Sequence, residues 1–123
     1  MNALDLATLR RLAAEGNEEA ANRLVELAAE RGDVVELRDL VDAGNELAGE
    51  KLATLAGERG DIDELRRLVG DGNELAADKL AQFAAAREDV DELSRLADEG
   101  NEVAATLLTR LIRGTEEGSE TWQ

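Results

Sequence analysis

The side chains in this sequence that are best able to do chemistry are carboxylates. The chain has 29 aspartate and glutamate residues but no histidine and no cysteine. Histidine is the commonest general base and metal ligand, and thiolates act as nucleophiles and soft metal ligands. Serine occurs only at Ser94 and Ser119, and neither has a neighbouring base with which to form a triad. What remains is a carboxylate pair acting as acid and base, or carboxylates holding a hard cation.

Neither form of carboxylate chemistry finds a supporting motif. Asp71-Gly72-Asn73-Glu74 resembles part of a calcium loop, but a loop counted from Asp71 places Leu75 where a third oxygen ligand is required. Other aspartates stand four residues before an arginine, as in ordinary surface ion pairs, for example Asp63 before Arg67. The sequence therefore predicts a protein that is not an enzyme, with no catalytic residue, no cofactor and no metal site.

The overall charge narrows the classes of partner. Fourteen basic and 29 acidic residues give a formal net charge of −15. A chain of this charge is repelled by nucleic acid and by anionic membranes, so we expect neither as a partner. The sequence also has no apolar run long enough for a signal peptide or a membrane span. We therefore expect a cytoplasmic protein whose partner is another protein or a peptide.

The elements that must position these side chains follow from a repeated triplet. Gly-Asn-Glu recurs at a fixed interval of 28 residues, which is typical of a helical repeat array. Glycine can adopt the left-handed conformation that ends a helix, and asparagine is a strong N-cap for the next helix. A joint this short predicts that the two helices it connects are antiparallel neighbours. The triplets begin at Gly16, Gly44, Gly72 and Gly100.

A second joint alternates with the first. It reads Arg-Gly-Asp from Arg31 and from Arg59, and Arg-Glu-Asp from Arg87. Arginine and glycine suit the end of a helix, and aspartate suits the N-cap of the next one. Because this role explains all three residues, we favour it over a cell-adhesion tripeptide. A glutamate three residues after each aspartate predicts an acidic capping box. The glutamates are Glu36, Glu64 and Glu92, and the aspartate caps are Asp5, Asp33, Asp61 and Asp89.

These joints predict an all-α fold, an α-solenoid of four 28-residue helix-turn-helix repeats with eight antiparallel helices. We expect one domain over residues 1–116, with a flexible tail at 117–123. Asn2 is expected to cap a first helix that spans about residues 3–15. The repeats are predicted at 5–32, 33–60, 61–88 and 89–116.

The apolar pattern predicts how the helices pack. In the first helix of a repeat, apolar residues recur at intervals of three and four, as at Val34, Leu37, Leu40 and Val41. The second helix has a broader apolar arc and many small residues, so we expect it to be the more enclosed of the two. No hairpin can bury both faces alone, and stacking the hairpins builds one continuous core.

With tandem antiparallel helix pairs and small residues at fixed positions, residues 5–116 resemble a tetratricopeptide-type array. The unit is shorter than a tetratricopeptide unit, it lacks the Tyr and Pro of that family, and Trp122 lies outside the repeats. The resemblance implies that a protein or peptide binds in a concave groove.

The candidate groove is the solvent-facing line of the first helices. Equivalent positions carry three arginines and one aspartate, with a valine and two aspartates one turn earlier. The arginines could meet an acidic peptide, but pairing with acids on their own helices is the favoured interpretation. The peptide-binding strip predicted from the sequence is Arg11, Val35, Asp39, Asp63, Arg67, Asp91 and Arg95.

The last repeat departs from the pattern. Leu107 replaces Arg23, Lys51 and Lys79, and Ile112 replaces an alanine. Together with Leu111 they predict a C-terminal helix that forms a weak homodimer; docking of Trp122 or packing of a further segment are the alternatives.

Two functions remain open from the sequence. One is a non-catalytic module that binds a protein or peptide on its first-helix surface. The other is an engineered or excised repeat scaffold with no biological ligand. Arginine is strongly preferred over lysine, and Gly49, Gly57 and Gly70 lie inside predicted helices, which favours a natural origin for the repeats.

Overall fold

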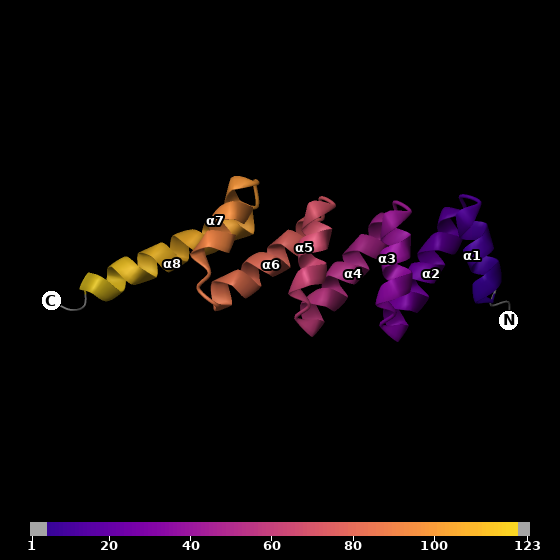
Figure 1. Ribbon diagram of the computed structural model, residues 1–123, viewed down its shortest axis with the longest axis horizontal. Coiled ribbons are helices and arrows are strands. Elements are labelled where there is room, and N and C mark those ends of the chain that lie inside the picture. The colour runs from indigo at the N-terminus through magenta and orange to yellow at the C-terminus, as the bar shows by residue number, and fades with distance from the viewer. Residues whose placement is uncertain (1–4, 121–123) are drawn as a thin grey trace. The chain divides into compact units, whose positions relative to one another are not determined.

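The structure, a computed structural model, describes residues 5–120, with side chains through residue 114. Within that range the chain forms eight helices and no strand, so the predicted all-α class is confirmed. The helices pack in pairs as hairpins, as expected of α-solenoid repeats (Figure 1). The helices are α1 (Leu6–Ala14), α2 (Glu18–Arg31), α3 (Val34–Asp42), α4 (Glu46–Arg59), α5 (Ile62–Gly70), α6 (Glu74–Ala86), α7 (Val90–Asp98) and α8 (Glu102–Glu120).

The helices divide into two compact units, Met1–Arg59 and Gly60–Gln123. The first unit holds the hairpins α1–α2 and α3–α4, and the second holds α5–α6 and α7–α8. The division falls within one residue of the predicted junction between the second and third repeats. Each unit therefore contains one stacking of a hairpin on the next.

In the first hairpin of each unit, the second helix is more enclosed by neighbouring helices than the first, as its broader apolar arc predicted. In the first unit α2 packs against α1, α3 and α4, and in the second α6 packs against α5, α7 and α8. The buried residues of α6 are mostly alanines, which allow the neighbouring backbones to approach closely. The core of the second unit comprises Ala77, Leu80, Ala81, Ala84, Leu93, Leu96 and Ala104.

The structure differs from the sequence prediction at both ends of the repeat array. The first helix starts at Leu6 and not near residue 3, because the Asp5 carboxylate accepts a hydrogen bond from the Thr8 N–H at 2.8 Å and caps it there. The predicted cap at Asn2 lies outside the described residues. At the other end α8 continues to Glu120, beyond the predicted repeat end at residue 116, so part of the expected tail is helical.

The two kinds of joint differ in backbone conformation. The glycines of the Gly-Asn-Glu joints have φ between 90° and 101°, whereas Gly32 and Gly60 have φ of 65° and 67°. The second range lies in the left-handed region that an L-residue can enter at a cost, and the first lies beyond it. This explains why glycine is kept at all four joints of the first kind. At the second kind it is replaced once, by Glu88 at φ 57°.

Because Glu88 is the one described residue other than glycine with a positive φ, Glu88→Gly should stabilise the protein. We expect about 0.5–1 kcal/mol, since the left-handed conformation costs a β-carbon-bearing residue about 1 kcal/mol or more and glycine gains flexibility when unfolded. Urea unfolding followed by circular dichroism measures the change. Glu99→Gly is the matched control: Glu99 has φ −82°, so the same replacement there should destabilise. A destabilised Glu88→Gly variant would contradict this account of the joint.

Candidate functional site

The asparagine of the Gly-Asn-Glu joint joins two hairpins. In the first unit the Asn45 Oδ1 accepts a hydrogen bond from the Ala48 N–H at 2.8 Å and caps α4. Its Nδ2 donates to the Asn22 Oδ1 on α2 of the preceding hairpin at 3.1 Å. One side chain therefore starts its own helix and holds the helix before it. An aspartate could do only the first of these.

The second unit repeats this arrangement with acidic partners. The Asn101 Oδ1 accepts a hydrogen bond from the Ala104 N–H at 2.8 Å, and its Nδ2 donates to the Asp78 Oδ1 on α6 at 2.9 Å. A longer bond of 3.4 Å reaches the Glu74 Oε1. Asn101 is only 4% exposed, so these bonds satisfy a buried amide.

Ion pairs form a second link between hairpins. In the first unit Arg10 on α1 donates to the Glu36 Oε1 on α3 at 2.7 Å. In the second, Arg66 on α5 donates to the Glu92 Oε1 on α7 at 3.0 Å, while Arg95 holds the other carboxylate oxygen. The side chain of Glu92 is 3% exposed. Each of these glutamates thus faces the preceding hairpin.

This pairing corrects part of the predicted capping box. Asp33 and Asp89 do accept hydrogen bonds from the N–H groups of Glu36 and Glu92. The glutamate carboxylates, however, do not return to the cap. The Asp33 N–H donates to the Ala28 carbonyl oxygen, which leaves Glu36 free to pair with Arg10. The preceding hairpin brings Arg10 within reach of the Glu36 carboxylate. A charged donor binds that carboxylate more strongly than the Asp33 N–H, which already has a hydrogen-bond partner.

The local environment shifts the pKa values of three carboxyl groups. Burial alone would raise the pKa of Glu92, but hydrogen bonds from Arg95 and Arg66, and their charges, outweigh burial and hold its pKa below the usual range. The Glu36 N–H lowers the pKa of Asp33, and the Thr8 N–H lowers that of Asp5. All three carboxyl groups stabilise the folded chain in their ionised form.

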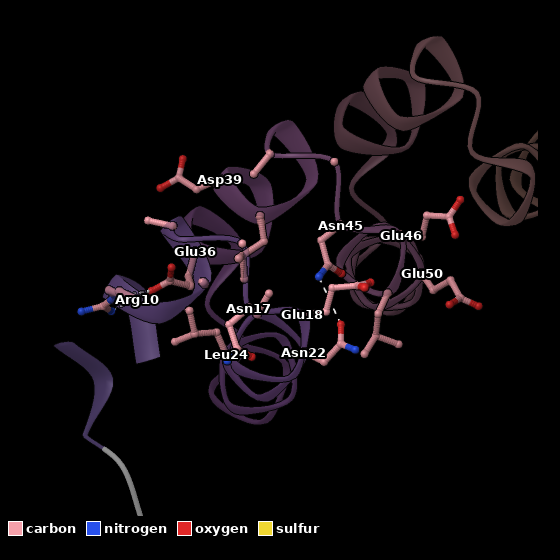
Figure 2. A pocket seen from close by; sticks show the side chains of 18 residues that line it. Arg10, Asn17, Glu18, Asn22, Leu24, Glu36, Asp39, Asn45, Glu46 and Glu50 are labelled. Atoms are coloured by element: carbon pink, nitrogen blue, oxygen red, sulfur yellow. Dashed lines mark hydrogen bonds and ion pairs between the residues drawn. The ribbon is translucent and has the colours of Figure 1, made fainter. Parts of the chain in front are cut away.

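A groove lies between the two hairpins of the first unit, with a volume of about 780 Å³. Its walls come from all four helices of the unit and from the two Gly-Asn-Glu joints. Figure 2 shows Arg10 with Glu36 at one side of the groove, Glu46 and Glu50 at the other, and the Asn22–Asn45 bond between them. Five carboxylates and one arginine line it: Glu18, Glu36, Asp39, Glu46, Glu50 and Arg10.

The second unit has a corresponding groove of about 420 Å³. Each of its eight lining residues stands 56 positions, or two repeats, after a residue that lines the first groove. The repeat geometry therefore forms the same groove twice. The lining residues of the second groove are Arg66, Val69, Gly70, Leu80, Glu92, Arg95, Leu96 and Glu99.

The structure divides the predicted peptide-binding strip. All seven residues are exposed, and Val35 is 72% exposed, but of these seven only Asp39 and Arg95 line one of the two grooves described above. Arg11 pairs with Glu15 on its own helix, as the favoured interpretation had it. The continuity of the strip from one unit to the other stays a prediction. The residues outside the grooves are Arg11, Val35, Asp63, Arg67 and Asp91.

The predicted four-residue ion pairs are wrong. In the described chain Asp63 pairs with Arg66 and not with Arg67, its Oδ1 lying 3.9 Å from the Arg66 Nη1. Arg95 pairs with Glu92 in place of Asp91. Arg95 turns toward Glu92 because that carboxylate is nearly buried between the hairpins and offers the stronger electrostatic partner.

The predicted self-association face is only partly exposed. Leu107 and Leu111 are partly buried and pack against the core of the second unit, whereas Ile112 is 50% exposed. The departure of α8 from the repeat pattern therefore serves the core as well as the surface. A weak homodimer through this helix stays a prediction, and Trp122 lies outside the described residues.

The described residues contain no cluster of three or more potential metal ligands. None of the helices in the described range combines the length and apolarity needed to cross a membrane. No known protein family, curated protein or solved structure matches this chain. What the geometry offers is one groove frame, formed once in each unit.

Sequence reasoning recognised the caps but missed the links between hairpins. A signal for them is present in the sequence. Arg10 and Arg66 are each followed after 26 residues by the glutamate with which they pair, Glu36 and Glu92. The position equivalent to these arginines in the last repeat holds Ser94, and the position equivalent to the glutamates in the first repeat holds Thr8. When two opposite charges recur together at the same spacing, the pattern indicates a contact between neighbouring repeats.

The double role of the joint asparagine can be tested with Asn101→Asp. The aspartate should still cap α8, but it loses both donated bonds and places a charge beside Asp78 and Glu74. We expect a loss of about 1–3 kcal/mol in the free energy of unfolding. Asn17→Asp is the matched control, because Asn17 is exposed and caps α2 with no hairpin before it. Equal effects of the two substitutions in urea unfolding would show that only capping matters.

The buried ion pair predicts a specific pH dependence. The folded pKa of Glu92 is lowered, so its stabilisation is complete above the unfolded value near 4.3 and is lost as the pH falls through the folded value. Glu92→Gln should therefore cost about 1–2 kcal/mol at pH 7 and progressively less below about pH 4. Urea midpoints of both proteins across pH 3–7 measure the difference. A cost that stays constant over this range would contradict the role of the ionised carboxylate.

Proposed function

We propose that this chain is a non-catalytic helical-repeat module that binds a protein or peptide on the surface of its first helices, with the grooves between hairpins as the binding surfaces. The observation that carries the proposal is the recurrence of one groove, with equivalent lining residues, in both units. Clefts between packed elements are where proteins commonly hold ligands.

The tetratricopeptide resemblance supports the same function, since arrays of that kind bind peptides on a concave surface. In this proposal the repeats are tetratricopeptide-like in role, with a shorter unit. The walls are also suited to variation: Asp39 in the first groove corresponds to Arg95 in the second, so the charge changes while the frame is kept. Selectivity for a partner would lie in such positions.

The test is selection from a random peptide library on the immobilised full chain. Selected peptides should bind a groove-blocked variant, Ala14→Trp with Gly70→Trp, at least about tenfold more weakly than the parent, because each tryptophan fills one groove. Gly70 has a negative φ and open space beyond its Cα, so it accepts a side chain.

The matched control is Glu58→Trp with Ala86→Trp, which adds two tryptophans at exposed positions outside both grooves. It should bind the selected peptides as the parent does. Equal binding by the blocked variant would overturn the groove as the site. Failure to select any peptide above an unrelated protein would favour the alternative function, a repeat scaffold without a ligand.

A further inference from the structure

The two grooves share a frame but differ in charge at one equivalent position of their lining, Asp39 in the first and Arg95 in the second. The shorter second groove is lined by two arginines, Arg66 and Arg95, and by two carboxylates, Glu92 and Glu99. Beyond that lining, carboxylates recur at the joint positions as Glu74 and Glu102. In the first groove Arg10 faces five carboxylates. The difference arises in part from a single exchange, Asp39 for Arg95, at an equivalent position.

Most of the carboxylates in the first groove have no cation of their own. Glu36 is paired with Arg10. The other four are exposed and form no ion pair within the described part of the chain. Solvated charges held on opposite walls of one cleft focus a negative potential into it. These four residues are Glu18, Asp39, Glu46 and Glu50.

The space between these charges is not polar throughout. Leu24 and Leu40, 2% and 8% exposed, form the base of the groove, and alanines with Leu47 line its sides. The carboxylates are spread over α2, α3 and α4 and do not converge on one point, in keeping with the lack of a metal-ligand cluster in the described chain. The complementary ligand has several separate cations joined by apolar groups.

We propose that the groove of the first unit binds a basic peptide segment of a partner protein, with lysine or arginine side chains meeting Asp39, Glu46 and Glu50 and its apolar side chains lying over Leu24 and Leu40. This inference rests on the proposed function and specifies its ligand. A volume of about 780 Å³ accommodates a few residues of such a segment. In the second groove Arg95 replaces Asp39, so that groove attracts a basic segment less strongly.

The direct test uses a fluorescein-labelled peptide that alternates lysine with leucine and alanine, titrated into the full chain. A peptide with glutamate at every lysine is the first control and should not bind. Asp39→Arg with Glu50→Arg should weaken binding by about tenfold or more. Glu30→Arg with Glu58→Arg makes the same change in net charge at exposed positions outside the groove, and should weaken it about twofold or less.

Side-chain amide resonances locate the peptide independently of affinity. Asn22 and Asn45 line the first groove and are bonded to each other, whereas Asn101 holds the equivalent place of Asn45 in the second unit. Binding in the first groove should shift the ¹⁵N–¹H signals of Asn22 and Asn45 and leave those of Asn101 in place. Loss of affinity in the groove variant together with these shifts would establish the proposal.

Three outcomes would overturn it. Equal weakening by the two charge-reversal variants would show diffuse attraction to an acidic chain. Spermidine binding as tightly as the peptide, with the same shifts, would show that the apolar base contributes nothing. Shifts confined to Asn101 would place the peptide in the second groove, in which case the proposed function stands and the acidic groove does not carry it.

Discussion

The amide of the joint asparagine is the interaction on which the rest of this structure depends. The short connection between the two helices of a hairpin leaves the first N–H groups of the second helix without partners, and the asparagine oxygen satisfies one of them. Its nitrogen then reaches the preceding hairpin, at Asn22 in the first unit and at Asp78 in the second. Helix initiation and hairpin stacking are thereby coupled through one planar group. The spacing between hairpins, and hence the groove, depends on that coupling.

The two kinds of joint have different structural requirements. The Gly-Asn-Glu joint has a φ that strongly favours glycine, and at Asn45 and Asn101 its asparagine adds a donor that an aspartate cap would lack. The other joint needs only a left-handed residue and an aspartate cap, and there glycine gives way to Glu88. Arg59 shows that this joint also connects hairpins, since its Nη2 donates to the Gly32 carbonyl oxygen at 3.2 Å.

Charged side chains vary more from one repeat to the next than the side chains that pack in the core. Buried positions of the helices repeat closely, with leucine at 24, 52, 80 and 108 and small residues around them. The groove positions vary, from Asp39 to Arg95, and from Asn22 to Asp78. A frame held by short caps and alanine contacts tolerates such exchanges because the changed side chains lie in solvent or at the groove edge, where single substitutions cost little. Function in a repeat protein of this kind is expected to lie in those positions.

The sequence by itself determined the repeat, the helix type and most of the boundaries, because these depend on local physics: the period of the Gly-Asn-Glu triplet, the 3.6-residue spacing of Leu37 and Leu40, and the capping aspartates. Only the tertiary structure decided what the long polar side chains do. From the sequence, Glu36 could close a capping box or pair with Arg10, and Arg95 could pair with Asp91 or with Glu92. The choice depends on how buried each carboxylate is and on which side chains the neighbouring hairpin brings within reach. The groove was likewise decided by the tertiary structure, because it forms between two hairpins and no single repeat contains it.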